Sequence, residues 1–78
     1  MFAAYEFINC DSGKAEAVVR ALRKIKGVKQ AHVVTGLHDI VAYVESPNLG
    51  ELTKLIIAKI QGTKGVGRTV TCIVVNGN

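Results

Sequence analysis

Strand-like and helix-like patterns of apolar residues alternate along this chain. A strand side chain points to alternate faces with a period of two residues, whereas a helix face repeats every 3.6 residues. In residues 2–9, Ala3, Tyr5 and Phe7 alternate with Ala4, Glu6 and Ile8, as in a strand. The same reasoning predicts these elements in order: a strand over 2–9, a helix over 13–26, strands over 28–35 and 40–45, a helix from Ser46-Pro47 to Gly62, and a strand over 66–75.

Capping residues set the ends of the two predicted helices. Asp11 or Ser12 can cap the first helix, and Gly27 follows its last turn, where a positive φ is common. Ser46-Pro47 predicts the start of the second helix, with a capping hydroxyl followed by proline at the first helical position. Each helix carries one apolar stripe: Ala15, Val18, Val19, Leu22 and Ile25 in the first, and Leu49, Leu52, Leu55, Ile56 and Ile60 in the second.

The predicted order is β-α-β-β-α-β, which defines an α+β fold. Two right-handed βαβ units joined by a hairpin give the ferredoxin-like layout, and this layout needs the shortest connections. It has an antiparallel four-stranded sheet in the order 4-1-3-2, with both helices on one face. With 78 residues, the chain has room for one domain, over residues 1–75, and a polar tail at 76–78.

The third and fourth predicted strands are apolar on both faces. Residues 40–44 read Ile-Val-Ala-Tyr-Val, and residues 72–75 read Cys-Ile-Val-Val. A sheet covered on one side alternates apolar and polar residues, and two helices cover only one side. The other face therefore needs a second sheet, which predicts a face-to-face dimer of two copies of this chain.

Composition and charge narrow the partners further. Hydrophobic residues make up 49% of the chain, but no apolar run approaches the ~20 residues of a membrane span, and no signal peptide is present. We therefore expect a cytoplasmic protein without membrane contact. The net charge is +4. Five basic residues fall in the first helix without interleaved aromatic side chains, so we expect a solvated face and no direct DNA binding: Lys14, Arg20, Arg23, Lys24 and Lys26.

Residues for catalysis or metal binding are sparse. His32 and His38 lack the spacing of a metal site, and no pair of carboxylates shares a helix face. Cys10 and Cys72 are offset by five residues on adjacent antiparallel strands, roughly 16 Å at the rise of a strand, which is too far for a disulfide. We expect no catalytic residue, no metal, no cofactor and two reduced cysteines.

The turn between the second and third strands offers the clearest candidate chemistry. Gly36 permits a positive φ, and Asp39 either accepts hydrogen bonds from turn amides or presents a carboxylate beyond the sheet. An ordinary hairpin explains both residues equally well. Thr69 and Thr71 share one face of the last strand, where they act as hydroxyl donors or simply as strand formers.

Several short motifs, in order, resemble the ligand-sensing domain of the Lrp/AsnC family of prokaryotic transcription regulators, known as the RAM domain. The motifs include Ala4-Tyr5, Ile8-Asn9, Gly13 and Gly27-Val28. They continue with Val34-Thr35-Gly36-x-x-Asp39-Ile40-Val41-Ala42 and end with Gly65-Val66-x-x-Thr69-x-Thr71. Together they cover nearly the whole chain. No DNA-binding helix-turn-helix precedes the first strand, so the resemblance is to the stand-alone form.

The resemblance implies a function and a set of site residues. The family forms dimers through its sheets, joins dimers into octamers or other rings, and binds amino acids in crevices between dimers. The implied ligand-binding residues are Gly36, Leu37, His38, Asp39, Thr69 and Thr71. The family usually has an aromatic residue where this chain has His38. Full-length Lrp/AsnC relatives are implied as possible partners in transcription regulation.

Three other interpretations remain open. A dimeric α/β-barrel enzyme shares the fold and the dimer, and polar residues pointing inward between helices and sheet would favour it; the aliphatic helix stripes argue against it. An ACT-like module would bind amino acids in a different assembly. A small nucleic-acid binder would use the basic face of the first helix.

Overall fold

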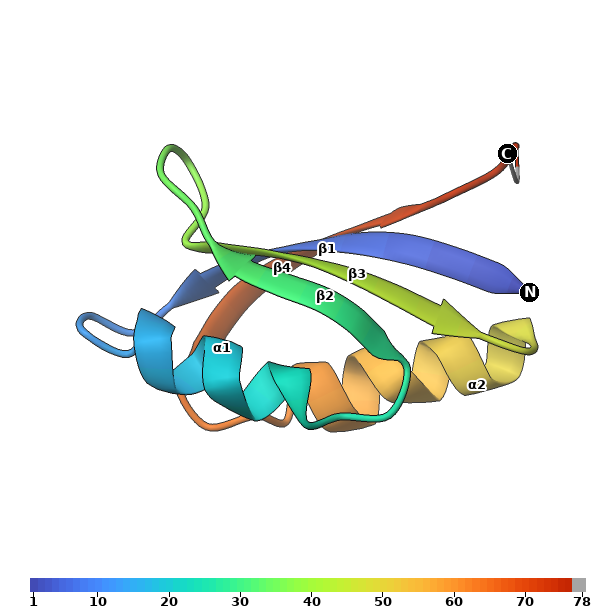
Figure 1. Cartoon of the computed structure of the whole chain (residues 1–78), viewed down its shortest axis with the longest axis horizontal. Helices are drawn as coiled ribbons and strands as arrows, with labels where there is room; N and C mark the ends of the chain where they lie inside the picture. Colours follow the sequence, from blue (N-terminus) through green and yellow to red (C-terminus); the bar gives the residue numbers. More distant parts are fainter. Residues whose placement is uncertain (77–78) are drawn as a thin grey trace.

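The computed structural model describes residues 1–76 and confirms the predicted order of strands and helices (Figure 1). A π-helical segment, labelled η1, directly continues the second helix. The elements are β1 (Phe2–Cys10), α1 (Ala15–Arg23), β2 (Val28–Val33), β3 (Ile40–Ser46), α2 (Leu49–Lys54), η1 (Leu55–Ile60) and β4 (Val66–Ile73).

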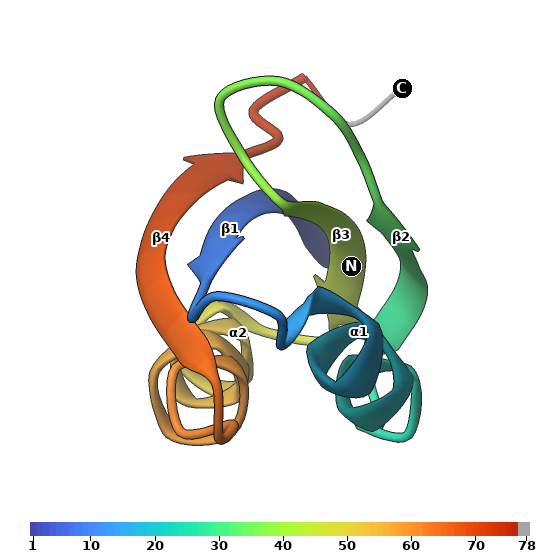
Figure 2. The ribbon, with the colours of Figure 1, turned by 90° about the vertical axis from the view of Figure 1, so that its left-hand side faces the viewer.

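The four strands form one antiparallel sheet in the order β2-β3-β1-β4, which is the predicted order. In the centre of the sheet, Tyr5 lies opposite Tyr43 of β3 on one side and opposite Cys72 of β4 on the other. Both helices lie on the same side of the sheet (Figure 2). The predicted ferredoxin-like α+β fold is therefore confirmed.

The hydrophobic core lies between the helix layer and the sheet. Alternate residues of β1 and β3 face this layer, and the apolar stripes of the helices meet them. Leu49 and Ile25 of the predicted stripes are only at its margin, since Leu49 is exposed and Ile25 half-buried. The buried apolar residues are Ala4, Ile8, Val18, Val19, Leu22, Ala31, Ile40, Ala42, Val44, Leu52, Leu55, Ile56 and Ile60.

The predicted N-caps of both helices are wrong, whereas Gly27 after the first helix has the expected positive φ. Lys14 occupies the N-cap position of α1 without a side-chain hydrogen bond, and the backbone oxygen of Asp11 accepts from the Lys14 amide instead. Ser46 is the last, buried residue of β3, so it is not available as a cap. Asn48 caps α2, because its Oδ1 accepts a hydrogen bond from the Glu51 amide at 2.8 Å.

Two strands are shorter than predicted. β2 ends at Val33 instead of Thr35, and β4 ends at Ile73 instead of Val75. The Val74 amide still donates to Ala3 O at 2.9 Å, so one hydrogen bond to β1 continues past the end of β4. Of the predicted polar tail, residues 77–78 lie outside the described part of the chain.

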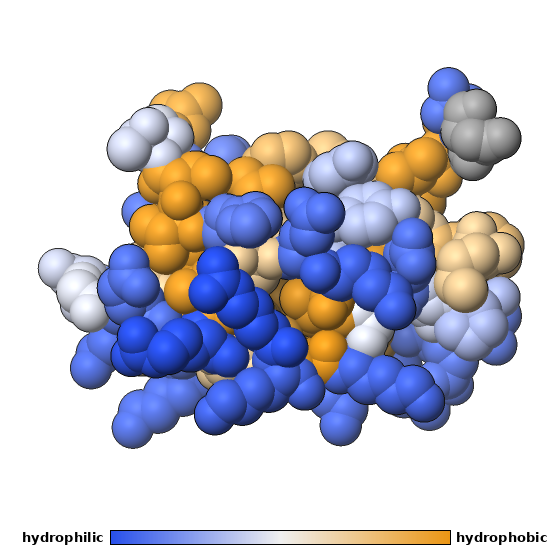
Figure 3. All heavy atoms as spheres, viewed as in Figure 1, coloured by the Kyte–Doolittle hydropathy of each residue, from blue (hydrophilic) through white to orange (hydrophobic). Residues whose placement is uncertain are grey.

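The sheet face opposite the helices carries exposed aromatic and apolar side chains; we call it the open face. The rings of Tyr5 and Tyr43 lie 5.0 Å apart on it, and Val70 of β4 lies opposite Phe7 of β1. Tyr5 is 44% exposed and Val70 is 43% exposed. Polar side chains gather mostly over the helix layer, along the lower half of Figure 3. No helix within residues 1–76 is long and apolar enough to cross a membrane.

Arg23 has a structural role that the helical pattern does not reveal. Its Nε donates a hydrogen bond to Ala31 O of β2 at 2.9 Å, in a partly buried position. Arg20 lies one turn earlier on α1 and belongs to the exposed residues. The basic face of α1 therefore includes one side chain that fixes the helix to the sheet.

We predict that Arg23→Gln lowers the free energy of unfolding by about 1 kcal/mol, because a charge-assisted hydrogen bond to a backbone oxygen is lost. Arg20→Gln is the matched control and should change it by less than about 0.5 kcal/mol. Urea unfolding followed by circular dichroism measures both. Equal stability of the two variants would contradict a structural role for Arg23.

Candidate functional site

The turn that joins β2 to β3 is held against the end of β1 by several hydrogen bonds. The Asn9 side chain donates from Nδ2 to Leu37 O at 2.9 Å, and its Oδ1 lies 3.1 Å from His38 Nδ1. The Asp39 amide donates to Ile8 O at 2.9 Å. Gly36 has a φ of +113°, which confirms that this position needs glycine. The turn is therefore a braced structure that keeps a fixed position over β1.

Asp39 takes part in this bracing. One carboxylate oxygen, Oδ2, accepts a hydrogen bond from the Cys10 amide at 2.7 Å. The ladder between β1 and β3 ends at the pair Ile8 and Ile40, so the Cys10 amide, two residues further along β1, needs an acceptor beyond the ladder. Asp39 is half-buried, and its second oxygen, Oδ1, has no hydrogen bond within the described chain. One oxygen thus holds the turn to β1, and the other keeps its capacity to accept a hydrogen bond.

His38 sits on the open-face side of the turn. The His38 ring packs on Phe7 with ring centroids 5.4 Å apart, and Phe7 belongs to the open face. Asn9 Oδ1 accepts only, so the hydrogen bond to it places a proton on His38 Nδ1. Nε2 is then the acceptor of the neutral ring. Leu37 is 90% exposed, which makes it the most prominent apolar side chain of the turn.

Thr69 and Thr71 do share one face of β4, but it is the face opposite the turn. They lie opposite Ile8 and Glu6 of β1, whose side chains point toward the helices. Thr69 Oγ1 accepts a hydrogen bond from Gln61 Nε2 at 2.9 Å, and Thr71 Oγ1 donates to Glu6 Oε1 at 2.9 Å. Within one subunit, the structure therefore separates the six predicted site residues into two groups on different sides of the sheet.

Glu6 is a buried polar residue that the sequence analysis did not single out. Its side chain is 0% exposed, between Ala4 and Ile8 on the helix-facing side of β1. Burial raises the pKa of its carboxyl, and the Thr71 hydrogen bond only partly opposes this. The signal was present in the sequence, because the strand alternation groups Glu6 with Ala4 and Ile8. An inward-facing polar residue is also the feature expected of a barrel-type enzyme, and here it comes from a strand.

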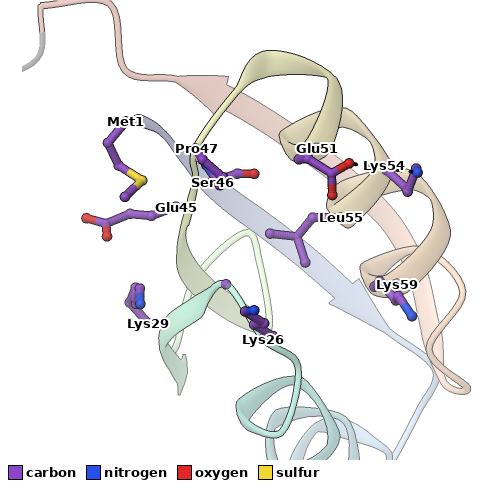
Figure 4. Close-up of a pocket in the computed structure, with 11 residues that line it drawn as sticks. Met1, Lys26, Lys29, Glu45, Ser46, Pro47, Glu51, Lys54, Leu55 and Lys59 are labelled. Carbon is purple, nitrogen blue, oxygen red and sulfur yellow. Dashed lines mark ion pairs between the residues drawn. The ribbon is translucent and has the colours of Figure 1, made fainter.

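A separate cavity of about 520 Å³ opens at the far end of the sheet from the turn. Four lysines surround it, and Glu51 pairs with Lys54 at 3.8 Å (Figure 4). Leu55 contributes an apolar side chain to its lining. None of the six predicted site residues lines this cavity. Its lysines are Lys26, Lys29, Lys54 and Lys59.

The remaining reactive side chains form no second site within residues 1–76. Both cysteines are free, as predicted, and Cys10 is half-buried. Burial and the nearby charges of Asp39 and Asp11 raise the pKa of the Cys10 thiol, which disfavours its nucleophilic thiolate form. In the same part of the chain, no group of three or more histidine, cysteine or acidic side chains is placed to hold a metal ion.

Comparison with known protein families decides the family. Residues 3–77 match the family described as the Lrp/AsnC ligand binding domain. This chain belongs to the Lrp/AsnC ligand-binding domain family. The match covers every element of the fold, including the turn at residues 36–39 and the threonine face of β4.

Known sequences similar to this Lrp/AsnC domain include regulators and an enzyme. An uncharacterized HTH-type transcriptional regulator of Pyrococcus furiosus is 41% identical over 64 residues, covering 81% of this chain and 43% of the regulator. A homocitrate synthase of Saccharolobus islandicus is 38% identical over 68 residues, which cover 86% of this chain but 14% of that enzyme. The chain thus spans less than half the length of the curated relatives it matches.

Solved structures share the fold of this Lrp/AsnC domain closely. A protein from Thermus thermophilus superposes with a TM-score of 0.93 at 27% identity, over 100% of this chain and 98% of the other. A Neisseria meningitidis transcriptional regulator, solved as a complex with L-Met, superposes with a TM-score of 0.85 at 14% identity, over 97% of this chain and 51% of that one. At that identity the second comparison shows the fold alone.

The buried carboxyl makes stability depend on pH. Because the pKa of Glu6 is higher in the folded protein than in the unfolded chain, its favourable contribution is complete below its ordinary value near 4.5 and is lost as the pH rises through the folded pKa. We predict that the wild-type free energy of unfolding falls relative to Glu6→Gln across this window, by at most about 1.4 kcal/mol per pH unit. Urea titrations of both proteins at equal concentration from pH 4 to pH 8 measure the difference, and a constant difference would contradict the prediction.

Proposed function

We propose that this chain is an effector-sensing module that binds an amino acid between subunits of a homo-oligomer. The observation that carries the proposal is the match of residues 3–77 to a ligand-binding domain of transcription regulators. The L-Met complex of the Neisseria regulator supports an amino acid as the class of effector, since the two chains share their fold. The matched enzyme shares only a segment with this chain, so its chemistry is not assigned to this protein.

The open face supports assembly through sheet packing. Tyr5 of β1 and Val70 of β4 are each more than 40% exposed, and the ring of Tyr43 packs against Tyr5. Large exposed apolar patches are uncommon on monomers and mark interaction surfaces. In the proposed assembly, two open faces pack together into a dimer, and dimers join into an octamer or another ring.

The separation of the predicted site residues fits a site built from more than one subunit. The turn offers Asp39 Oδ1 and the backbone groups around Gly36 and Leu37, whereas β4 offers the hydroxyls of Thr69 and Thr71. A free amino acid carries an ammonium and a carboxylate close together, so it needs an acceptor and several donors. In the proposed crevice, the turn of one subunit supplies the acceptor and β4 of another supplies the donors.

DNA contact is assigned to full-length Lrp/AsnC relatives that co-assemble with this module. The basic residues of α1 offer charge without a groove-reading element, and Arg23 is committed to Ala31. Binding of the effector to this module would then change the assembly of the ring, and that change would alter DNA binding by the full-length partners.

Assembly through the open face can be tested at one position. We predict that Tyr5→Lys shifts the protein from dimer or larger species to monomer at micromolar concentration, because it places a charge in the apolar interface. Ile57→Lys is the matched control, since Ile57 is 59% exposed on η1, away from the open face. Sedimentation velocity measures both. A wild-type protein that is a folded monomer at this concentration would exclude the proposed assembly.

The structural role and the proposed binding role of Asp39 fall on different carboxylate oxygens, so they can be tested separately. We predict that Asp39→Asn weakens amino-acid binding at least tenfold, because the ammonium loses its charged acceptor. Its side-chain oxygen can still accept from the Cys10 amide, so the turn keeps its brace. Asp39→Ala should lose both binding and part of the stability of the turn.

Calorimetric titration across the common amino acids, with thermal unfolding in parallel, measures these effects. If Asp39→Asn binds the same amino acid as tightly as the wild type, the carboxylate serves only the turn.

A further inference from the structure

Glu6 carries a buried oxygen without a partner. Its Oε1 accepts from Thr71, but Oε2 has no hydrogen bond from any of residues 1–76. The only ion pair within that part of the chain joins Lys54 and Glu51, so no cation there neutralises Glu6. Buried polar groups in folded proteins are nearly always satisfied, and an exception calls for a bound partner or a functional role.

The fold itself does not require a carboxyl at this position. The neighbours of Glu6 on the helix-facing side of β1 are Ala4 and Ile8, and Ala42 lies opposite on β3. These side chains are apolar and buried, so an apolar side chain at position 6 would continue the core. A carboxyl here costs stability when it ionises, so its structural benefit is limited to one hydrogen bond.

Glu6 lies next to an exposed side chain of β4. Thr71, which donates to Glu6, is itself exposed, and it lies on β4, an edge strand. Ile73, the next residue on the same face, is 46% exposed. The last residues of β4 rise away from the helix layer (Figure 1), so this face of the strand is not covered by α2. Rotation of the Thr71 side chain would bring Glu6 into contact with an arriving group.

We propose that Glu6 is the acidic subsite for a cationic side chain of the effector, which makes the effector a basic amino acid with a terminal ammonium. This inference rests on the proposed function, because it uses Thr69 and Thr71 as part of the effector crevice. The polar strip Gln61–Thr69–Thr71–Glu6 leads from the surface to the carboxyl, with hydrogen bonds of 2.9 Å at both ends.

The geometry favours an ammonium on a methylene chain over a wider group. Glu6 is fully buried and accepts a hydrogen bond from the exposed Thr71, so a group that reaches the carboxyl past this side chain must be slender. An ammonium has three donors, which match Oε2, Oε1 and a threonine hydroxyl. Its methylene chain would lie against the apolar side chains of the core and of Ile73.

A comparison of L-lysine with L-norleucine tests the subsite, since norleucine has the same aliphatic chain without the ammonium. Titration calorimetry of the full chain should show lysine binding at least tenfold more tightly than norleucine. In Glu6→Gln this preference should disappear while norleucine binding stays within twofold. Glu16→Gln is the matched control, because Glu16 is an exposed carboxylate on α1, away from both the open face and the polar strip.

The outcomes separate this inference from the proposed function. If wild type binds norleucine or another neutral amino acid at least as tightly as lysine, or if Glu6→Gln keeps the lysine preference, the acidic subsite is excluded and amino-acid sensing stands. If no amino acid binds the wild type, both proposals fail. Circular dichroism of Glu6→Gln confirms folding, and because this change removes a buried charge it should not lower stability at neutral pH, whereas a merely structural role for the carboxylate predicts that it does.

Discussion

The structure depends on a sheet that is covered by helices on one face only. β1 and β3 are the central strands, and their helix-facing residues, from Ala4 and Ile8 to Ile40 and Val44, are fully buried. Their other face has no cover within the described chain, and it carries the aromatic side chains of Tyr5, Phe7 and Tyr43. In a domain of 78 residues, such a face is a large share of the apolar surface. The chain thus devotes one side of its sheet to its own core and, in the proposed assembly, the other to contact with a second copy.

Local patterns in the sequence are sufficient for the order and direction of the elements. The two-residue period of β1 and the apolar stripe of α1 are properties of neighbouring residues, and the handedness of βαβ units then fixes the sheet order. The helix ends were harder to predict, because the N-cap is whichever of several nearby polar side chains reaches a free amide of the first turn. Ser46 and Asn48 are both good caps, and the pairing of Ser46 with Phe2 in the sheet is what leaves the role to Asn48.

The π-helical segment η1 could not be predicted from the sequence for a related reason. The Gln61 amide donates to Ile56 O, five residues earlier, and this wider turn allows Leu55 and Ile60 to be buried together. An α-helical stripe fits the same residues from sequence alone. The wider turn also ends at Gln61, whose side chain reaches Thr69, so the departure from regular helix lies beside the polar strip.

For the candidate site, the sequence identified the turn but not its supports. Gly36 and Asp39 are recognisable from their residue types, whereas Asn9 and Cys10, which hold the turn, are 28 and 29 residues distant from their partners. Glu6 was visible as a member of the buried set of β1, but residue type alone suggests an exposed position for glutamate. Only the structure shows that its carboxyl is enclosed.

The brace on the turn also makes a mechanical connection across the domain. Cys10 is held by Asp39, and the next amide, that of Asp11, donates to Gly65 O just before β4 begins. A displacement of the turn would therefore act on two successive peptide groups of β1. Through them it would act on Gly65, just before the start of β4, the strand that carries Thr69 and Thr71. These two amides form a short tether between the two groups of predicted site residues, so in the proposed crevice a ligand held by one group would be linked to the other through the backbone.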